Sequence, residues 1–190
     1  GQSSVASATS ATAFGQSASA SGDYATAVGQ GAVSSGEGSS SFGRSSRATG
    51  VNTLALGNGS FASGANSVAL GAGSVASRSN TVSVGSSSIQ RTISGLAPGI
   101  ENTDAVNVGQ LDDAAKTSNR GIAGVSAMAG LPPIDDGKKF SVGLGAGYYE
   151  NETAIAFGAQ ARVADQFNFK LSVATSKGDY VSSVGLGYSF

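Results

Sequence analysis

The sequence predicts a mainly β protein with one long helix per chain. Three observations lead to this fold class: a fourteen-residue repeat over residues 1–85, a heptad pattern over 104–131, and four alternating segments over 138–190. The repeat predicts an N-terminal β-roll, the heptads predict a short coiled coil, and the alternation predicts strands of a transmembrane β-barrel. Residues 86–103 are then the connector between the roll and the helix.

The repeat is defined by glycine, which recurs every fourteen residues and is preceded by an apolar residue in each available copy. Fourteen residues accommodate two short strands with a turn after each, so stacked copies predict a solenoid. The inward side chains are small, so one roll buries little apolar surface and we expect several rolls to associate side by side. A flexible Gly/Ser/Ala-rich linker would not keep this register. The repeated glycines are Gly1, Gly15, Gly29, Gly43, Gly57, Gly71 and Gly85.

The helix is predicted to begin at Asn102, Thr103 and Asp104, which are residues that favour helix N-termini. It ends at Leu131, because two prolines follow. A helix over 104–130 would be about 40 Å long, enough to cross a hydrocarbon layer of about 30 Å. The 3-4 spacing of heptad core positions is carried by Val108, Leu111, Ala115, Ser118, Ile122 and Val125.

In each of the four C-terminal segments, every second residue is apolar and the residues between them are glycine, serine or polar, although Val181 and Ser182 break the pattern. The two alternating sets are called the outer and the inner parity. Each segment has the length, about nine to eleven residues, of a membrane-spanning β-strand. Nine of the thirteen aromatic residues lie between Phe140 and Phe190. Several fall near predicted strand ends, as in the aromatic girdles of membrane barrels: Phe140, Tyr148, Tyr149, Phe167, Tyr180, Tyr188 and Phe190.

The inner parity of these strands is unusually rich in glycine, which often marks the close approach of another backbone. We therefore expect the helix, with its own small residues, to pack inside the barrel, and Gly158 in particular to contact it. The predicted packing positions are Gly143, Gly145, Gly147, Gly158, Gly185 and Gly187. Arg162 and Lys170 share this parity and either contact the helices or line residual water.

Four strands cannot close a barrel, and an open sheet edge is not tolerated in lipid. The smallest single-chain barrels have about eight strands and are already filled by side chains. Two chains would give eight strands and two helices, which overfills the interior. Three chains, giving twelve strands around three helices, are favoured.

Composition argues against several other functions. Eleven basic and twelve acidic residues give almost no net charge, whereas a nucleic-acid binder shows a basic patch. The absence of His and Cys removes the usual general base, thiol nucleophiles, disulfides and the commonest metal ligands. The glycines over 143–147 lack the spacing of a nucleotide-binding loop, and the acidic pairs over 112–113 and 135–136 read as solvated charges. We expect no enzyme, cofactor or metal site.

Three segments resemble modules of the trimeric autotransporter adhesins with a YadA-like head. The hexapeptides over 66–71 and 80–85 resemble the head signature, and the segment over 102–111 resembles the neck. The glycine-rich helix, the proline break and the four strands ending at Phe190 resemble the C-terminal membrane anchor. The modules occur in the order of the family, with the usually long stalk almost absent.

This resemblance implies a homotrimer in the outer membrane of a Gram-negative bacterium, with the head exposed at the cell surface. Three chains would share a twelve-stranded barrel that exports its own head, and the C-terminal aromatic resembles the signal read by the barrel-assembly machinery. The implied partners are outer-membrane lipid and host matrix proteins, host cells or other bacteria. An outer-membrane channel or translocator with a non-adhesive structural head is the alternative. An ice-binder or phage-spike fragment would not explain the C-terminal strands. The best-formed repeat gives the candidate ligand-binding residues Asn66, Ser67, Val68, Ala69, Leu70 and Gly71.

Overall fold

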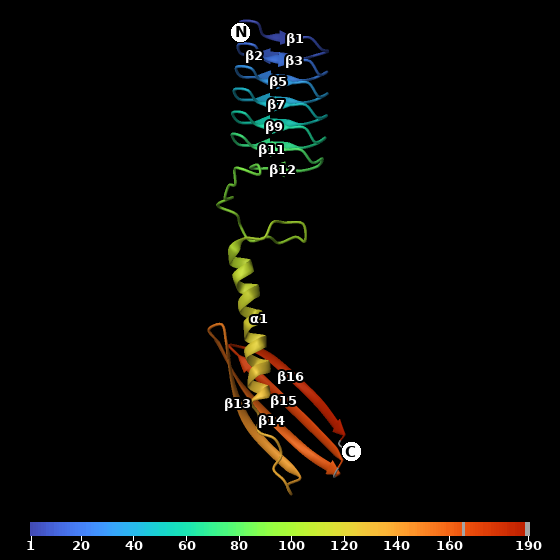
Figure 1. Cartoon of the computed structure of the whole chain (residues 1–190), viewed down its shortest axis with the longest axis vertical. Coiled ribbons are helices and arrows are strands. Elements are labelled where there is room, and N and C mark those ends of the chain that lie inside the picture. The colour runs from blue at the N-terminus through green and yellow to red at the C-terminus, as the bar shows by residue number, and fades with distance from the viewer. Residues whose placement is uncertain (165, 189–190) are drawn as a thin grey trace. The chain divides into compact units, whose positions relative to one another are not determined.

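The computed structural model of the chain describes residues 1–164 and 166–188. These form two compact units, Gly1–Ser94 and Gly95–Phe190 (Figure 1). The first unit is a stack of β coils, and the second is a helix on a four-stranded sheet.

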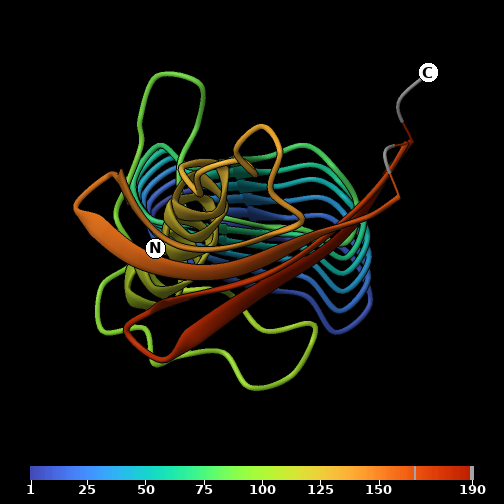
Figure 2. The same cartoon turned by 90° about the horizontal axis from the view of Figure 1, so that it is seen from below.

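The first unit contains two parallel six-stranded sheets, and successive coils add one strand to each (Figure 2). Neighbouring strands always pair residues fourteen positions apart, such as Val68 with Val82. The predicted β-solenoid is therefore confirmed. One sheet contains β1 (Val5–Ala6), β3 (Ser19–Ala20), β5 (Val33–Ser34), β7 (Arg47–Ala48), β9 (Phe61–Ala62) and β11 (Val75–Ala76). The other contains β2 (Thr12–Phe14), β4 (Thr26–Val28), β6 (Ser40–Phe42), β8 (Leu54–Leu56), β10 (Val68–Leu70) and β12 (Val82–Ser83).

The interior of the roll is narrow because only alanine, serine and threonine point into it. Ala20, Ala48 and Ala62 form one buried column, and Ala27, Ala55 and Ala69 form parts of another. The repeated glycines permit this close stacking. A β-carbon at Gly15 would lie 2.6 Å from the carbonyl oxygen of Gly29 in the next coil, and the φ of +128° at Gly15 also disfavours other residues.

A residue in the left-handed backbone conformation also recurs every seven positions, so each fourteen-residue coil contains two of them. It is glycine in some turns but serine or asparagine in most others, and asparagine tolerates this conformation better than other non-glycine residues. The fourteen-residue glycine pattern alone did not reveal this second period. Its non-glycine members are Ser3, Ser10, Ser17, Tyr24, Ser45, Asn52, Asn66 and Asn80.

The helix α1 (Val108–Ala129) begins later than the sequence predicts. Its N-cap is Asn107, whose side chain accepts from the amide of Gln110 while the Gln110 side chain accepts from the amide of Asn107, forming a capping box. Asp104 does not cap the helix, because its carboxylate accepts hydrogen bonds from the amides of Glu101 and Ile100. These two bonds lower the pKa of Asp104 below its usual value.

Replacing Asn107 with alanine is expected to cost about 1 kcal/mol of helix stability, because one orphan amide loses its acceptor. The thermal midpoint of the purified protein measures the loss. The matched control is Asn102→Ala at the residue expected from the sequence to begin the cap. An equal loss in both variants would contradict the observed cap.

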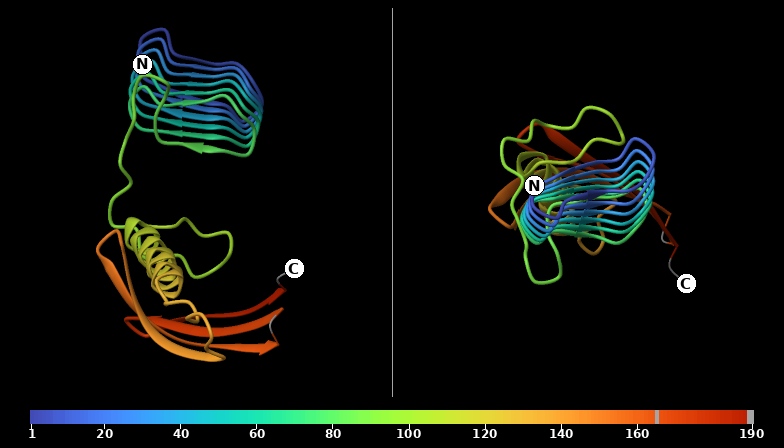
Figure 3. Two further views of the ribbon diagram at one scale, coloured as in Figure 1. Left: turned by 60° about the horizontal axis from the view of Figure 1, so that its bottom comes forward. Right: turned by 90° about the horizontal axis from the view of Figure 1, so that it is seen from above.

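The sheet of the second unit is antiparallel and follows chain order. Its strands are β13 (Phe140–Tyr149), β14 (Glu152–Ala164), β15 (Phe167–Ser176) and β16 (Asp179–Tyr188). The sheet curves, and α1 lies on its concave face (Figure 3). Within the described residues, no helix combines the length and the apolar character needed to span a membrane.

The supposed break in the last strand has a structural explanation. Val181 pairs with Ala174 on the inner face of the sheet, and Ser182 faces outward, so the alternation continues. The Val181 side chain fills the space beside Gly124 of α1, where a β-carbon would lie 3.1 Å from Val181 Cγ2. A larger inward residue is accommodated here because the helix has no side chain at that point.

Candidate functional site

The inner face of β13 carries no side chains where α1 crosses it. A β-carbon at Gly145 would collide with the carbonyl oxygen of Ala127, and one at Gly147 would collide with that of Ala123. The two backbones are therefore in direct contact, an approach that only glycine permits.

The glycine-lined contact continues beyond the end of the helix. A β-carbon at Gly143 would lie 2.6 Å from Cδ of Pro132, and one at Gly158 would collide with the Leu131 side chain. Gly158 was expected to contact the helix itself. In the structure its neighbour is Leu131, which lies just after α1 ends.

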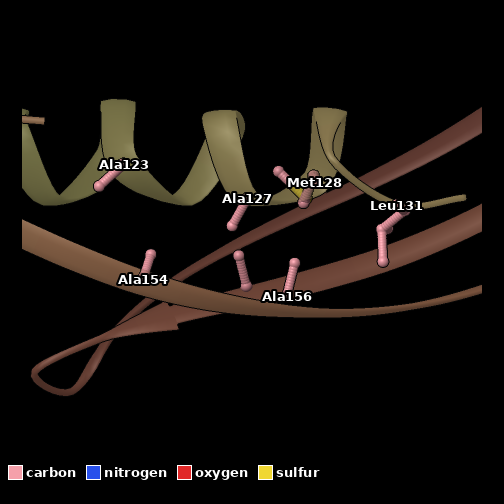
Figure 4. Packing of buried hydrophobic residues seen from close by; sticks show 7 residues of the cluster. Ala123, Ala127, Met128, Leu131, Ala154 and Ala156 are labelled. Atoms are coloured by element: carbon pink, nitrogen blue, oxygen red, sulfur yellow. The ribbon is translucent and has the colours of Figure 1, made fainter. Parts of the chain in front are cut away.

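A small apolar cluster joins α1 to β14 and β15, the two strands that follow β13. Ala123 and Ala127 point from the helix toward Ala154 and Ala156 of β14 (Figure 4). Ala174 of β15, Met128 and Leu131 complete the cluster. Its members are mostly alanine, so the helix axis lies close to the sheet and each contact is small.

The other predicted glycines lie on a part of the inner face that their own helix does not cover. A β-carbon at Gly185 or Gly187 would meet only Lys170 Cβ at 3.9 Å or Asn168 Cβ at 3.8 Å. Nearby, Lys170 Nζ donates to the carbonyl oxygen of Met128 at 3.4 Å, and Arg162 Nε donates to Asn168 Oδ1 at 3.4 Å. Lys170 therefore contacts the helix end, and the packing role of Gly185 and Gly187 stays a prediction.

The exposed glycine Gly185 allows contact with a second chain to be detected. In the isolated chain Gly185→Ala meets ordinary van der Waals space and should cost little. If a neighbouring helix covers this face, the same substitution should lower the thermal midpoint of the assembly by several degrees, as overpacking does. A midpoint unchanged in Gly185→Ala would show that no helix covers this part of the sheet.

The outer face of the sheet is largely apolar. Alternate residues of every strand point away from α1 and are exposed, including Val142, Leu144, Ile155, Phe157, Leu171, Val173, Val184 and Leu186. Exposed aromatic side chains lie at the strand ends, at Phe140, Tyr148, Tyr149, Phe167, Tyr180 and Tyr188. Phe190, also predicted for this girdle, lies outside the described residues. An apolar band flanked by aromatic residues is typical of lipid-facing strands.

The predicted heptad positions lie on the side of α1 away from its own sheet. Leu111 is 63% exposed and Val125 is 55% exposed, although the helix buries Ala123 and Ala127 on its opposite side. The helix therefore has two apolar faces, of which one packs on its own sheet. The exposed positions, named the seam from here on, are Val108, Leu111, Ala115, Ser118, Ile122 and Val125.

The roll has an exposed apolar face of its own. The outward side chains of the sheet from β2 to β12 stand in register, and Phe14 and Val82 are 70% and 69% exposed. Leu56 and Leu70 continue the same face.

The six candidate ligand-binding residues differ in accessibility. Ser67 and Ala69 are fully buried, so they cannot contact a ligand and are removed from the predicted site. Asn66 lies in a turn, where its side-chain amide accepts from Asn52 and donates to Asn80 in a ladder along the stack. Leu70 is exposed and Val68 is partly exposed. Gly71 lies beside the guanidinium of Arg91, which donates to the carbonyl oxygens of Ala72 and Val84 at the last coils of the roll.

One charged cluster in the second unit was missed in the sequence. Arg120 of α1 reaches Glu152 and Asp179, which begin β14 and β16, and Lys177 also reaches Glu152. The only available signal was that Glu152 and Asp179 share the inner parity of their strands. Within the described ranges 1–164 and 166–188, no group of His, Cys, Asp and Glu side chains is arranged to hold a metal ion.

Three family models match the chain, and together they leave only short gaps. The YadA head domain repeat matches residues 1–32, 34–60 and 62–88. The coiled stalk of trimeric autotransporter adhesin matches 92–127, and the YadA-like membrane anchor domain matches 132–190.

Individual relatives match smaller parts. The autotransporter adhesin EhaG of Escherichia coli O157:H7 is 41% identical over 119 residues, which are 50% of this chain. The chain spans only 8% of the length of that relative. The crystal structure of the collagen-binding domain of Yersinia adhesin YadA is 28% identical and covers 58% of this chain and 78% of that one, with a TM-score of 0.41.

The domain order agrees with the geometry of each unit. The head matches fall on the roll, and the anchor match falls on the sheet that carries an apolar outer face and a helix on its inner face. The anchor places the C-terminal unit in the outer membrane and the head at the surface. The chain therefore belongs to the YadA-like trimeric autotransporter adhesins.

Proposed function

We propose that three copies of this chain form one outer-membrane pore, that the pore exports the heads, and that the exported heads attach the bacterium to host matrix proteins, host cells or other bacteria. The twelve-stranded pore would hold three helices and work without a cofactor or catalysis. The barrel-assembly machinery and outer-membrane lipid would be the partners of the anchor.

The observation that carries the proposal is the incomplete sheet of the anchor. It has four strands, and the outer edges of β13 and β16 pair with no other described strand. Its apolar outer face suits lipid, but lipid cannot satisfy the hydrogen-bonding groups of an open edge. Pairing β16 of one chain with β13 of the next satisfies both edges, because the same two edges recur in every copy.

Two further surfaces support three chains and not two. Gly185 and Gly187 present an inner face that their own helix leaves uncovered, and the seam presents apolar residues to other helices. An eight-stranded barrel is already filled by side chains and leaves no room for two helices. A twelve-stranded barrel with three helices gives each seam two neighbours and each uncovered face a helix.

The exposed apolar face of the roll supports association of the heads along their length. Contiguous apolar patches of this kind mark protein interaction sites. The opposite sheet, from β1 to β11, then remains available to a ligand. The relative EhaG is named an adhesin, and we propose the same activity for this head.

The proposal is tested on bacteria that display the intact chain. Cells with the protein should be retained on surfaces coated with matrix proteins several-fold more than cells without it, and Fab fragments against the head should remove the difference. Unboiled extracts should show a band near three chain masses that boiling converts to one. Equal retention despite proven surface display would overturn the adhesive role. High conductance of the intact protein in planar bilayers would instead favour a channel.

A further inference from the structure

Four charged side chains meet where α1 passes the ends of both strand hairpins. Arg120 Nε lies 3.6 Å from Glu152 Oε2, and Arg120 Nη1 donates to Asp179 Oδ2 at 3.2 Å. Lys177 Nζ lies 3.0 Å from the same oxygen of Glu152. Glu152 is 5% exposed, so one carboxylate is held almost out of water between two cations. Its removal from water is tolerable only while those cations stay in place.

The cluster lies on the same side of α1 as the small-residue packing. Arg120 precedes Ala123 and Gly124 by one turn, and all three face the sheet. From residue 121 to residue 134 the chain has no charged residue, so Arg120 is the last charge before the proline break.

Packing and charge both bear on the axial position of α1 against the sheet. Withdrawal of α1 by one turn, about 5.4 Å, would put Ala127 at the place of Ala123 and Gly124 at the place of Arg120. The contact of Ala123 would be reproduced by Ala127, but Met128 would take the place of Gly124 beside Val181. Glu152 would lose one of its two cations, and Asp179 would lose its only ion pair among the described residues. Arg120 therefore adds an ionic contribution to the packing that distinguishes the two positions.

We propose that Arg120, with Glu152 and Asp179, forms an ionic latch that sets the final axial position of α1 in the pore. The inference rests on the proposed function, since export draws the chain through the pore until this segment remains in it. The segment after Arg120 carries no charge up to residue 134, so no ion pair holds it as it moves along the inner face of the sheet. The arrival of Arg120 at the two hairpin ends stops the helix, because Glu152 belongs to one hairpin and Asp179 to the other.

Cysteine cross-linking can read this position directly, because the natural chain has no cysteine. Ala123 faces Ala154 across the interface (Figure 4), so the pair Ala123→Cys and Ala154→Cys reports the observed register. The pair Ala127→Cys and Ala154→Cys reports withdrawal by one turn. Both are measured on full-length chains isolated after labelling of their exposed heads on the cell surface.

With Arg120 intact, the first pair should cross-link strongly and the second weakly. Arg120→Gln should raise the ratio of the second cross-link to the first by about tenfold, as expected when a buried carboxylate loses its partner. Arg120→Lys should restore most of the original ratio. The matched control is Lys116→Gln, which removes an exposed cation one turn earlier and should leave the ratio unchanged.

An unchanged ratio in Arg120→Gln would overturn the latch. If that variant fails to assemble, Asp179→Asn provides the same test, and an unchanged ratio there overturns the latch as well. Failure of the proposed function looks different, because the cysteine pairs with Arg120 intact would then not reach the cell surface or form trimers. In that case both the shared pore and the latch are rejected.

Discussion

Replacing Gly147 with valine should abolish assembly of the anchor. A β-carbon at this position would collide with the carbonyl oxygen of Ala123 and would lie 3.0 Å from Cβ of Ser126. The colliding atoms belong to the backbone of a helix and cannot move aside as a side chain can. We expect a loss of more than about 3 kcal/mol, at the upper end of what overpacking costs. Unboiled gels should show only monomer.

The control for this substitution is the neighbouring residue of the same strand. Ala146 faces away from α1, so Ala146→Val adds a bulkier β-branched residue on the outer face of β13. It should leave the heat-resistant band unchanged. Equal loss in both variants would mean that valine harms the strand itself, and a stable trimer in Gly147→Val would contradict the observed backbone contact.

Placing a charge in the seam should separate the chains. Ile122 is 45% exposed in one chain, because it lies on the side of α1 away from its own sheet. If the seams of three chains meet in the pore, Ile122→Asp brings three carboxylates together, one from each chain, and the seam has no basic side chain to pair with them. Burial of unpaired charge costs several kcal/mol, at least about 3 kcal/mol per chain. The heat-resistant trimer and the surface display of the head should both be lost.

Thr117→Asp introduces the same charge at an exposed position outside the seam and serves as the control. It should retain the trimer at its original melting temperature. A trimer that survives Ile122→Asp would show that the exposed apolar residues of α1 face solvent in the assembly, and the three-helix pore would have to be abandoned.

The parts of this fold that follow a period could be predicted from the sequence. The fourteen-residue glycine register determines strand pairing in the roll, because partners are always one repeat apart. The two-residue alternation likewise identifies the inner and outer faces of the sheet. These patterns repeat many times, so an exception such as Val181 does not obscure them.

Two kinds of feature could not be predicted: the choice between neighbouring residues that could each cap the helix, and contacts between residues far apart in the sequence. Asp104 and Asn107 are both good N-caps, and only the structure shows that Asp104 binds the amides of a preceding turn while Asn107 pairs with Gln110. Arg120 and Asp179 are 59 residues apart and belong to no repeat. Burial likewise removed Ser67 from the candidate ligand site, because the repeat alone does not say which serines face inward.

The most direct test of the shared pore is the mass of the intact protein extracted in mild detergent. Native mass spectrometry should find one species with three chains of 18.4 kDa each. The species should yield single chains only when heat or denaturant unfolds the barrel. A folded particle with the mass of one chain would show that four strands suffice without partners, and it would contradict the shared pore.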